Sequence, residues 1–325
     1  MPNKKVVILF NKISEQPTLD EEDVLYQVDE VHKSLIELGY EPFQVPFSIE
    51  IKDALDKIKS IAPKFIFNLV ESIDGKNELI SLAPLLLNHI DIPYTGSPLE
   101  AIFLTTNKLW SKKIMRHMQV NTPDWFQLNQ LNLLDKEKKY IVKPITEDGS
   151  VKLHQESVFS ANDIQYFEGL KKMNSKEYFI EEYLDGREFN VVVFGTASEP
   201  LVLPPSEILF ENYPEGKAKI LCYRSKWIED SFEYENTNRT FNFEPQEEEL
   251  LNQMKEMSIK CWHEFGLNGY CRMDIRTDSQ NIPYIIEINA NPCITPMSGI
   301  LTTAEKAGYE YVDVIKMIID STFND

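Results

Sequence analysis

The apolar residues of the first hundred positions fall into short continuous runs that alternate with amphipathic segments. Residues 6–10 and 65–70 form runs of the kind found in parallel strands that are buried on both faces. Between them, the spacing of apolar residues predicts a helix over about 22–38, a strand around 41–46 and a second helix over 49–60. This βαβαβ order predicts an open α/β unit at the start of the chain.

Acidic residues follow two of these predicted strands. The first strand lacks the G-x-G-x-x-G loop that would bind a dinucleotide. Ligands of open α/β sheets nevertheless bind at the carboxyl ends of the strands. Glu21 and Glu22 lie after the first strand and Glu71 follows the third, so these carboxylates are candidates for substrate contact. A solvated carboxylate is the alternative for each.

The middle of the chain has less regular patterning. A helical segment around 79–89 precedes a Pro- and Gly-containing turn cluster at 92–98, which marks a candidate domain boundary. A single helix is expected over about 105–118. From 200 to 245 the chain is irregular, and a loop region of that length inside a compact protein is more often functional than not.

A regular alternation of polar and apolar residues marks residues 269–293, near the end of the chain. Two alternating runs flank a polar segment with turn residues, which predicts an antiparallel hairpin. Alternation places Arg272 and Asp274 on one face of the first strand, and Glu287 and Asn289 on one face of the second. If Asp274 lies opposite Glu287, the same register places Arg272 opposite Asn289. One register therefore aligns all four polar residues.

The two carboxylates on this face require a compensating positive charge, because like charges directly opposite each other destabilise a strand pair. Asp274, Glu287 and Asn289 offer oxygen donors without Cys or His, a set that suits a hard divalent ion such as Mg2+. A solvated hairpin whose carboxylates alternate by chance is the alternative, and the spacing alone leaves it open. Glu287 and Asn289 lie in an otherwise apolar run, where unpaired polar groups are costly, and this favours the metal site.

Isolated lysines beside turns and strand ends are the candidates for phosphate binding. Lys143 ends a short predicted strand and is followed by a Gly149-Ser150 turn, where glycine permits close backbone approach to an anion. Lys108 lies on the helix expected after the turn cluster, and Lys226 lies between aromatic residues in the irregular stretch. Each signal is weak alone, and a plain hairpin turn with a surface lysine is the alternative at Lys143.

Composition and charge limit the classes of function. The chain has 325 residues, of which 42% are hydrophobic and 26% charged, enough for two or three packed units of a globular protein. A formal net charge of −19 opposes binding to nucleic acids and anionic membranes, and no basic stripe offsets it. No apolar stretch approaches the roughly 20 residues that span a bilayer, and residues 6–10 lack the features of a signal peptide. A cytoplasmic location is expected.

Cysteine, histidine and serine chemistry finds little support. The four cysteines form no C-x-x-C pair and no metal-ligand spacing, and the five histidines are scattered, which disfavours zinc and a catalytic triad. Ser298 lacks a G-x-S-x-G elbow, and Lys108 has no G-x-x-x-x-G-K context. The expected chemistry therefore rests on cations and carboxylates.

Several motifs occur in order along the chain: Lys143-Pro144 with the Gly-Ser turn, residues 181–184, Glu188 after an Asp-Gly pair, and the two segments 272–274 and 287–289. Together they resemble the ATP-grasp superfamily, specifically its D-alanine--D-alanine ligase branch, and the resemblance runs nearly end to end. It implies an α/β protein whose ATP-binding part is α+β, with ATP between two antiparallel sheets. The implied units are an N-terminal α/β domain (1–98), a central subdomain (99–185) and a C-terminal subdomain with the metal site (186–325).

The resemblance also implies a role for each matching residue. Contacts to the ATP phosphates would come from Lys108, Lys143 and Lys226, and contacts to the adenine from Glu181, Tyr183 and Leu184. Glu188 would bind the ribose. Two Mg2+ ions, for which Mn2+ could substitute, would be held by Asp274, Glu287 and Asn289. Catalysis would involve Arg272, which stabilises the oxyanion, and Ser150, on a loop that covers the phosphates, while the substrate would contact Glu21, Glu22 and Ser298.

The implied reaction is an ATP-dependent ligation of a carboxylate to an amine, between two small amino acids or an amino acid and a peptide. The carboxylate would first take the γ-phosphoryl group, and the amine would then attack the acyl phosphate. Residues 151–153 and Cys293 depart from the D-alanine ligase pattern, so the product stays open. The alternatives are D-alanine--D-alanine ligase activity itself and a nucleotide-binding module without ligase activity. A homodimer is compatible with the branch.

Overall fold

The computed structural model describes residues 3–147 and 149–323, which form three β-sheets with helices around them. The N-terminal sheet is parallel, with the strand order β2-β1-β3. The prediction of an open βαβαβ unit is confirmed. Its elements are β1 (Lys5–Asn11), α1 (Leu19–Glu37), β2 (Glu41–Phe47), α2 (Ile51–Ile61) and β3 (Phe65–Leu69).

Two short helices occupy the region where one helix was expected over 105–118. Helix α4 covers Leu99–Thr106 and helix α5 covers Lys108–His117. Asn107 between them has an extended backbone, and its side chain accepts hydrogen bonds from two amides of the first turn of α5. The Asn107 cap begins a new helix and so separates α4 from α5. The spacing of apolar residues does not reveal such a break. Upstream lie the 3-10 helix η1 (Asn77–Leu79) and α3 (Leu82–Ile90).

The central unit is built on a four-stranded antiparallel sheet in the order β4-β7-β5-β6. Its strands alternate with short helical segments that cover one face with apolar side chains. The elements are β4 (Trp125–Gln127), η2 (Leu128–Leu133), β5 (Lys139–Pro144), η3 (Gln155–Ser157), β6 (Val158–Ser160), α6 (Ile164–Leu170) and β7 (Tyr178–Glu182).

The largest sheet is antiparallel, with the path β11-β10-β8-β12-β13, and β9 pairs with β8 off this path. Residues 200–245, expected to be irregular, in fact contribute three strands and two short helices: β9 (Leu201–Val202), β10 (Ser206–Phe210), α7 (Tyr223–Trp227), α8 (Phe232–Glu235) and β11 (Thr237–Thr240). The strands have only two to five residues each, which is too short to show a clear alternation of polar and apolar residues. The other elements are β8 (Glu188–Phe194), η4 (Pro245–Glu247), α9 (Glu248–Glu264), β12 (Tyr270–Thr277) and β13 (Pro283–Asn289).

The hairpin register predicted from alternation is confirmed. In the β12–β13 pair, Asp274 lies opposite Glu287 and Arg272 lies opposite Asn289. A bulge shifts the register after Asp274. On the other side of β12, Asp274 lies opposite Asn190 of β8, so the polar face continues across the sheet.

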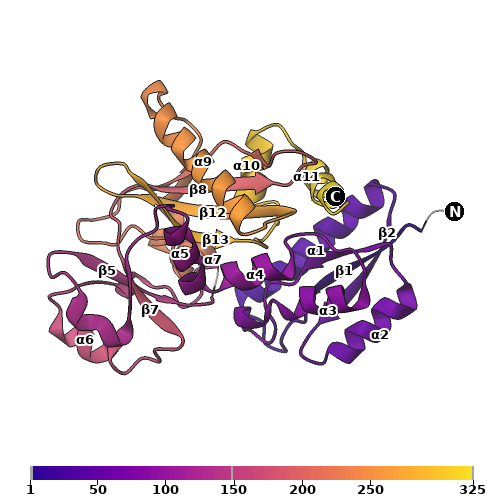
Figure 1. Ribbon diagram of the computed structural model, residues 1–325, viewed down its shortest axis with the longest axis horizontal. Coiled ribbons are helices and arrows are strands. Elements are labelled where there is room, and N and C mark those ends of the chain that lie inside the picture. The colour runs from indigo at the N-terminus through magenta and orange to yellow at the C-terminus, as the bar shows by residue number, and fades with distance from the viewer. Residues whose placement is uncertain (1–2, 148, 324–325) are drawn as a thin grey trace.

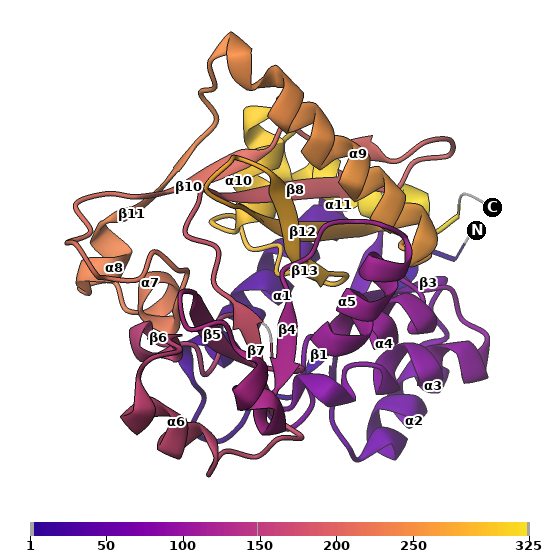
Figure 2. The same cartoon turned by 60° about the vertical axis from the view of Figure 1, so that its left-hand side comes forward.

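Packing joins the first and last parts of the chain. Helices α1 and α11 (Tyr311–Ser321) lie side by side (Figure 1). A common core contains residues from the N-terminal sheet, from β8, and from α10 (Gly299–Lys306) and α11. Helix α9 covers one face of the large sheet, and the four-stranded sheet lies on the opposite side of the large sheet (Figure 2). The boundaries 98 and 185 stay a prediction. None of the described helices has the length and apolarity to cross a membrane.

Candidate active site

A pocket between the four-stranded and the six-stranded sheets gathers most of the residues predicted from the sequence. Strands β5 and β7 contribute to one side, and β8, β12 and β13 to the other. Apolar side chains such as Ile141, Ile220 and Ile286 line part of the wall. Ten predicted residues line the same pocket: Lys108, Lys143, Ser150, Glu181, Tyr183, Leu184, Glu188, Lys226, Asp274 and Glu287.

A buried carboxylate holds two lysines on the β7 side of the pocket. Glu181 is 1% exposed, and its Oε1 and Oε2 lie 2.5 Å from the Nζ atoms of Lys143 and Lys112, respectively. Lys112 Nζ also donates to Thr122 Oγ1 at 2.8 Å. Burial raises the pKa of Glu181, but the two lysines outweigh burial and hold that pKa below its ordinary value. Burial lowers the pKa of Lys112 to about 8 in spite of the neighbouring carboxylate.

A second buried pair lies at the start of β8. Arg276 Nη1 is 3.1 Å from Glu188 Oε2, and the same guanidinium donates to the carbonyl oxygens of Lys219 and Gly186 at 2.6 and 3.0 Å. It also lies 5.1 Å from the ring centroid of Tyr183. Burial raises the pKa of Glu188 by more than the charge of Arg276 lowers it. Arg276 therefore fixes two of the residues predicted to bind the nucleoside.

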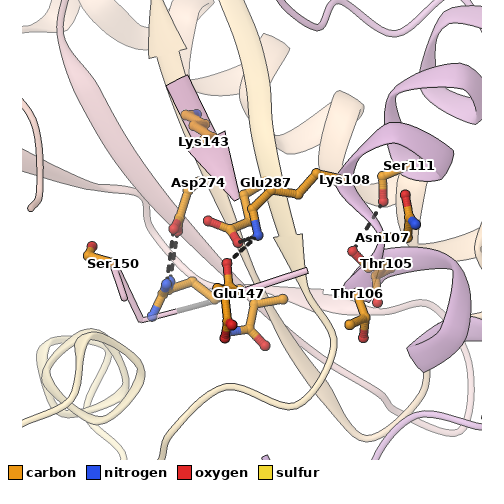
Figure 3. A network of polar contacts seen from close by, with 12 residues as sticks. Thr105, Thr106, Asn107, Lys108, Ser111, Lys143, Glu147, Ser150, Asp274 and Glu287 are labelled. Atoms are coloured by element: carbon orange, nitrogen blue, oxygen red, sulfur yellow. Dashed lines mark hydrogen bonds and ion pairs between the residues drawn. The ribbon is translucent and has the colours of Figure 1, made fainter. Parts of the chain in front are cut away.

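The opposed carboxylates of the hairpin are each paired with a cation. Arg272 Nε and Nη2 lie 2.7 and 2.9 Å from the two oxygens of Asp274, and Asn190 Nδ2 donates to Asp274 Oδ1 at 2.8 Å. Lys108 Nζ lies 2.8 Å from Glu287 Oε1 and donates to the Glu147 carbonyl oxygen at 2.6 Å. Figure 3 shows Lys108 and Glu147 beside Glu287, with Asp274 nearby. Side-chain cations thus balance the charge that the sequence analysis assigned to a metal.

The donor set on this face fits Mg2+ bound together with a phosphate. No group of three His, Cys, Asp or Glu side chains is arranged to hold a metal in the described part of the chain. The predicted set instead combines the carboxylates of Asp274 and Glu287 with the amide of Asn289, two residues further along β13 on the same face. All are oxygen donors. Mg2+ typically takes one or two carboxylates and completes its shell with water and substrate phosphates.

Three hydrogen bonds tie the loop after β5 to the segment 221–227. Ser150 has a φ of 63°, in the left-handed region, so its conformation depends on such contacts. The bonds join Ser150 Oγ to Leu221 O at 2.6 Å, Trp227 Nε1 to Gly149 O at 3.2 Å and the Tyr223 amide to Leu153 O at 3.0 Å. This loop, residues 149–153, therefore lines the pocket and is held against the segment 221–227.

Lys226 reaches the pocket from α7. It is half-buried, and no carboxylate within the described ranges forms an ion pair with it. Burial lowers its pKa first, and the nearby charge of Arg272 lowers it further. An anion in the pocket would offset both effects.

The predicted substrate residues near α1 do not reach the pocket lining. Glu21 is the third residue of α1 and belongs to the capping box that Thr18 begins, so it accepts hydrogen bonds from Ser14 Oγ and the Thr18 amide. Glu22 is exposed. The side chain of this turn that contacts the C-terminal unit is Asp23. Its Oδ2 lies 3.1 Å from the Sγ of Cys293, the thiol donating. Burial raises the pKa of that thiol, and the neighbouring carboxylates raise it further. Sequence reasoning had not singled out Asp23.

Ser298 caps α10, where its Oγ accepts a hydrogen bond from the Leu301 amide at 3.3 Å. Next to it, Gly299 borders the side chain of Arg239 from β11. Arg239 Nη1 donates to Ser206 Oγ at 2.5 Å. The structure thus adds a cation beside the predicted substrate residue.

Residues 114–320, more than half of the chain, match the family model described as D-ala D-ala ligase C-terminus. The chain belongs to this ligase family. Relatives include the D-alanine--D-alanine ligase of Aquifex aeolicus, 27% identical over 89% of this chain and 92% of the relative. Another is the D-alanine--D-alanine ligase B of Clostridium perfringens, 27% identical over 84% of each chain.

Solved structures of similar fold come from the same group of enzymes. The D-alanine--D-alanine ligase of Bacillus anthracis complexed with ATP aligns with a TM-score of 0.74, 23% identity and coverage of 99% of this chain and 97% of that one. The D-alanyl-alanine synthetase A of Vibrio cholerae aligns with a TM-score of 0.77, 17% identity and 99% coverage of both. The predictions of a ligase of this branch and of an ATP-grasp fold are confirmed.

Four residues in or near the pocket of this chain were not predicted as site residues. Arg276 continues the alternation of Arg272 and Asp274 on the same strand face, which is a signal that could have identified it. Lys112 follows Lys108 by one helical turn and shares its face. Asn190 and Arg239 carry no local signal, because their partners lie far away in the sequence.

Proposed function

We propose that this ligase activates the carboxylate of one small amino acid with ATP and joins it to the amine of a second amino acid or a peptide. The observation that carries the proposal is one pocket in which three lysines gather beside an oxygen-rich hairpin face. Lys108, Lys143 and Lys226 are suited to hold phosphates. Asp274 and Glu287 are suited to hold the accompanying cation.

The first step would transfer the γ-phosphoryl group of ATP to the substrate carboxylate. Bound Mg2+ would offset charge on the phosphate oxygens, and Asp274, Glu287 and Asn289 are the residues to hold it. Lys143 is kept in place by Glu181, and Lys108 by Glu287 and the Glu147 carbonyl. Transfer then depends on positioning more than on a protein nucleophile.

The second step would be attack of the amine on the acyl phosphate. The tetrahedral intermediate carries an oxyanion, and Arg272 lies on the hairpin face where it can stabilise that charge. Phosphate leaves as the amide forms. The loop held by Ser150 and Trp227 would exclude water, which would otherwise hydrolyse the acyl phosphate.

The nucleoside would bind at the Tyr183 end of the pocket. Tyr183 and Leu184 follow β7, and Glu188 begins β8, so the connector between the two sheets would hold the adenine and the ribose. Arg276 would keep Glu188 and Tyr183 in position. D-alanine is the first amino acid to test, because the named relatives are D-alanine--D-alanine ligases.

The experiment is release of ADP and phosphate with a panel of D- and L-amino acids, alone and in pairs, with product masses recorded. Asp274→Asn is expected to reduce kcat by roughly a hundredfold or more, since losing several kcal/mol of charge stabilisation corresponds to that factor. Asp278→Asn is the matched control, because Asp278 caps the turn of the same hairpin outside the pocket. If no amine stimulates turnover and Asp274→Asn behaves like the control, the proposal fails.

A further inference from the structure

Residues 217–227, called the strap from here on, contact the pocket along most of their length. The carbonyl oxygen of Lys219 accepts hydrogen bonds from Arg276 Nη1 at 2.6 Å and from the Tyr183 hydroxyl at 3.3 Å. Further along, the strap carries the partners of the loop 149–153 that are described above. Three of its side chains line the pocket: Ile220, Leu221 and Lys226. The strap therefore joins the proposed nucleoside end of the pocket to the loop over the proposed phosphate end.

A buried carboxylate on α8 holds two points of the strap together. Glu233 is 5% exposed, and its Oε1 lies 2.6 Å from Lys217 Nζ. Its other oxygen, Oε2, lies 3.1 Å from Arg224 Nε. One cation precedes and the other follows the stretch 218–223, which contains two of the pocket-lining residues. The carboxylate thus closes a ring around that stretch.

Aromatic rings and the large sheet hold this ion-pair cluster in place. Lys217 Nζ lies 5.1 Å from the ring centroid of Phe232 and 5.8 Å from that of Tyr213, distances at which a ring attracts a cation. Helix α8 leads directly into β11, the edge strand of the large sheet. Because Glu233 lies on α8, its carboxylate connects the strap to that sheet.

The cluster depends on the negative charge of Glu233. Burial raises the pKa of this carboxyl, but hydrogen bonding, above all from Lys217, outweighs burial and holds the pKa at about 2. The carboxylate is therefore charged at neutral pH, and a neutral amide in its place would leave both cations without it. The Lys217 side chain is 23% exposed and that of Arg224 is 56% exposed, so the pair with Lys217 should contribute more.

We propose that Glu233 is a positioning residue for ATP binding and for the exclusion of water, and that it acts through the strap. Glu233 is not one of the described residues that line the pocket, so its effect passes through Lys217 and Arg224 to the stretch between them. The inference rests on the proposed ligation. A strap held in place keeps Lys226 at the phosphates and keeps the loop bonded, whereas a loosened strap would weaken nucleotide binding and admit water to the acyl phosphate.

The first test is steady-state kinetics of the full-length enzyme. Glu233→Gln is expected to raise KM for ATP roughly fivefold or more, as loss of a partly exposed ion pair implies, and to change kcat less. It should also release more phosphate per molecule of amide product. Glu233→Asp, which keeps the charge, should recover part of both effects. Glu235→Gln is the matched control, because Glu235 is exposed on the same helix.

These readouts separate positioning from a merely structural role. A structural role lowers the amount of folded enzyme and hence kcat, but changes neither KM for ATP nor the ratio of phosphate to amide. An unchanged KM together with an unchanged ratio in Glu233→Gln overturns the inference, and circular dichroism checks that each variant is folded. Lys217→Met should reproduce Glu233→Gln, and the double variant should add little, because the two residues share one ion pair. Fully additive effects would also overturn it.

A second readout needs no turnover. The strap contains four positions after which trypsin cleaves: Lys217, Lys219, Arg224 and Lys226. Cleavage there, identified from fragment masses, should be roughly fivefold faster in Glu233→Gln than in the wild type or Glu235→Gln, because cleavage follows the population of the open form. A non-hydrolysable ATP analogue with Mg2+ should slow it.

Failure of the proposed ligation is recognised separately, as absence of turnover with every amino acid. The proteolysis then still decides the role of Glu233. Faster strap cleavage that the ATP analogue slows supports the inference. Equal cleavage in Glu233→Gln and the wild type overturns it, and so does faster cleavage that the analogue leaves unchanged.

Discussion

Replacing Glu181 by Gln would leave two pocket lysines without the carboxylate that they share. The Nζ atoms of Lys112 and Lys143 each lie 2.5 Å from one oxygen of Glu181. The side chains of Glu181 and Lys112 are 2% and 1% exposed, so water cannot take over the role of the carboxylate. The substitution therefore tests whether this group anchors the phosphate side of the pocket.

The expected loss of stability is larger for Glu181→Gln than for Lys112→Met. Removing one partner of a buried ion pair costs about 3–5 kcal/mol. Lys112 can limit this loss by releasing its proton. Its pKa is about 8, so neutralising it at pH 7 costs only about 1.4 kcal/mol. We therefore expect a loss of about 3 kcal/mol for Glu181→Gln, at the lower end of that range. Lys112→Met leaves Glu181 paired with Lys143 and should cost about 1–2 kcal/mol.

The pH dependence follows from the depressed pKa of Lys112. The folded-state pKa of about 8 lies below the ordinary value of 10.5, so between these values the unfolded chain binds more protons and stability increases with pH. This contribution is fully present above 10.5 and is lost as pH falls through 8. Glu181→Gln lowers the folded-state pKa further and extends the window downward. Its deficit relative to the wild type should therefore be larger at pH 7 than at pH 9.

Urea unfolding at pH 7 and pH 9, followed by tryptophan fluorescence and circular dichroism, measures these differences. The matched control is Glu182→Gln, because Glu182 is the next residue and pairs with Lys138, whose side chain is 44% exposed. Such a pair is worth at most about 1 kcal/mol. The reasoning is refuted if Lys112→Met costs as much as Glu181→Gln, or if the deficit of Glu181→Gln does not change with pH.

Two further predictions concern the connector and the loop. A Cβ at Gly186 would lie 2.1 Å from the carbonyl oxygen at the end of β12, so Gly186→Ala should destabilise by about 1–3 kcal/mol in urea. Gly169→Ala, whose Cβ meets nothing within 4 Å, should not, and equal effects would contradict the packing argument. Trp227→Phe removes the donor to Gly149 O and should increase the amount of phosphate released per molecule of amide product. Trp110→Phe, at an exposed tryptophan, is the control, and an unchanged amount in Trp227→Phe would contradict loop shielding.

The hairpin was predictable because its information is local. Arg272, Asp274, Glu287 and Asn289 occupy alternate positions in two adjacent runs, and only one register brings all four together. The bulge after Asp274 was not predictable, because it depends on how both neighbouring strands pair with β12. The βαβαβ unit was recognised because its apolar runs and amphipathic helices are long enough to show their periods, whereas the strands within 200–245 have only two to five residues.

The site residues that sequence reasoning missed depend on distant partners. Arg276 contacts Glu188, 88 residues earlier in the chain, and Asn190 contacts Asp274, 84 residues later. Arg239 contacts Ser206, 33 residues earlier in the chain, and lies against Gly299 of α10. The choice of Glu21 and Glu22 near the first strand also shows this limit. The capping role of Glu21 is local, while Asp23 and Gln27 of the same helix contact Cys293 and Ile294 in the C-terminal part of the chain.

The charge balance of the pocket connects these observations to function. A chain with a net charge of −19 must concentrate cations locally to bind a polyphosphate. The structure achieves this by pairing most pocket cations with buried carboxylates, which keeps them ordered and charged. Lys226 and Arg239 are exceptions among the described residues. Lys226 lines the pocket, where the phosphate of a bound nucleotide would complete the charge balance, and Arg239 lies against Gly299 at the start of α10.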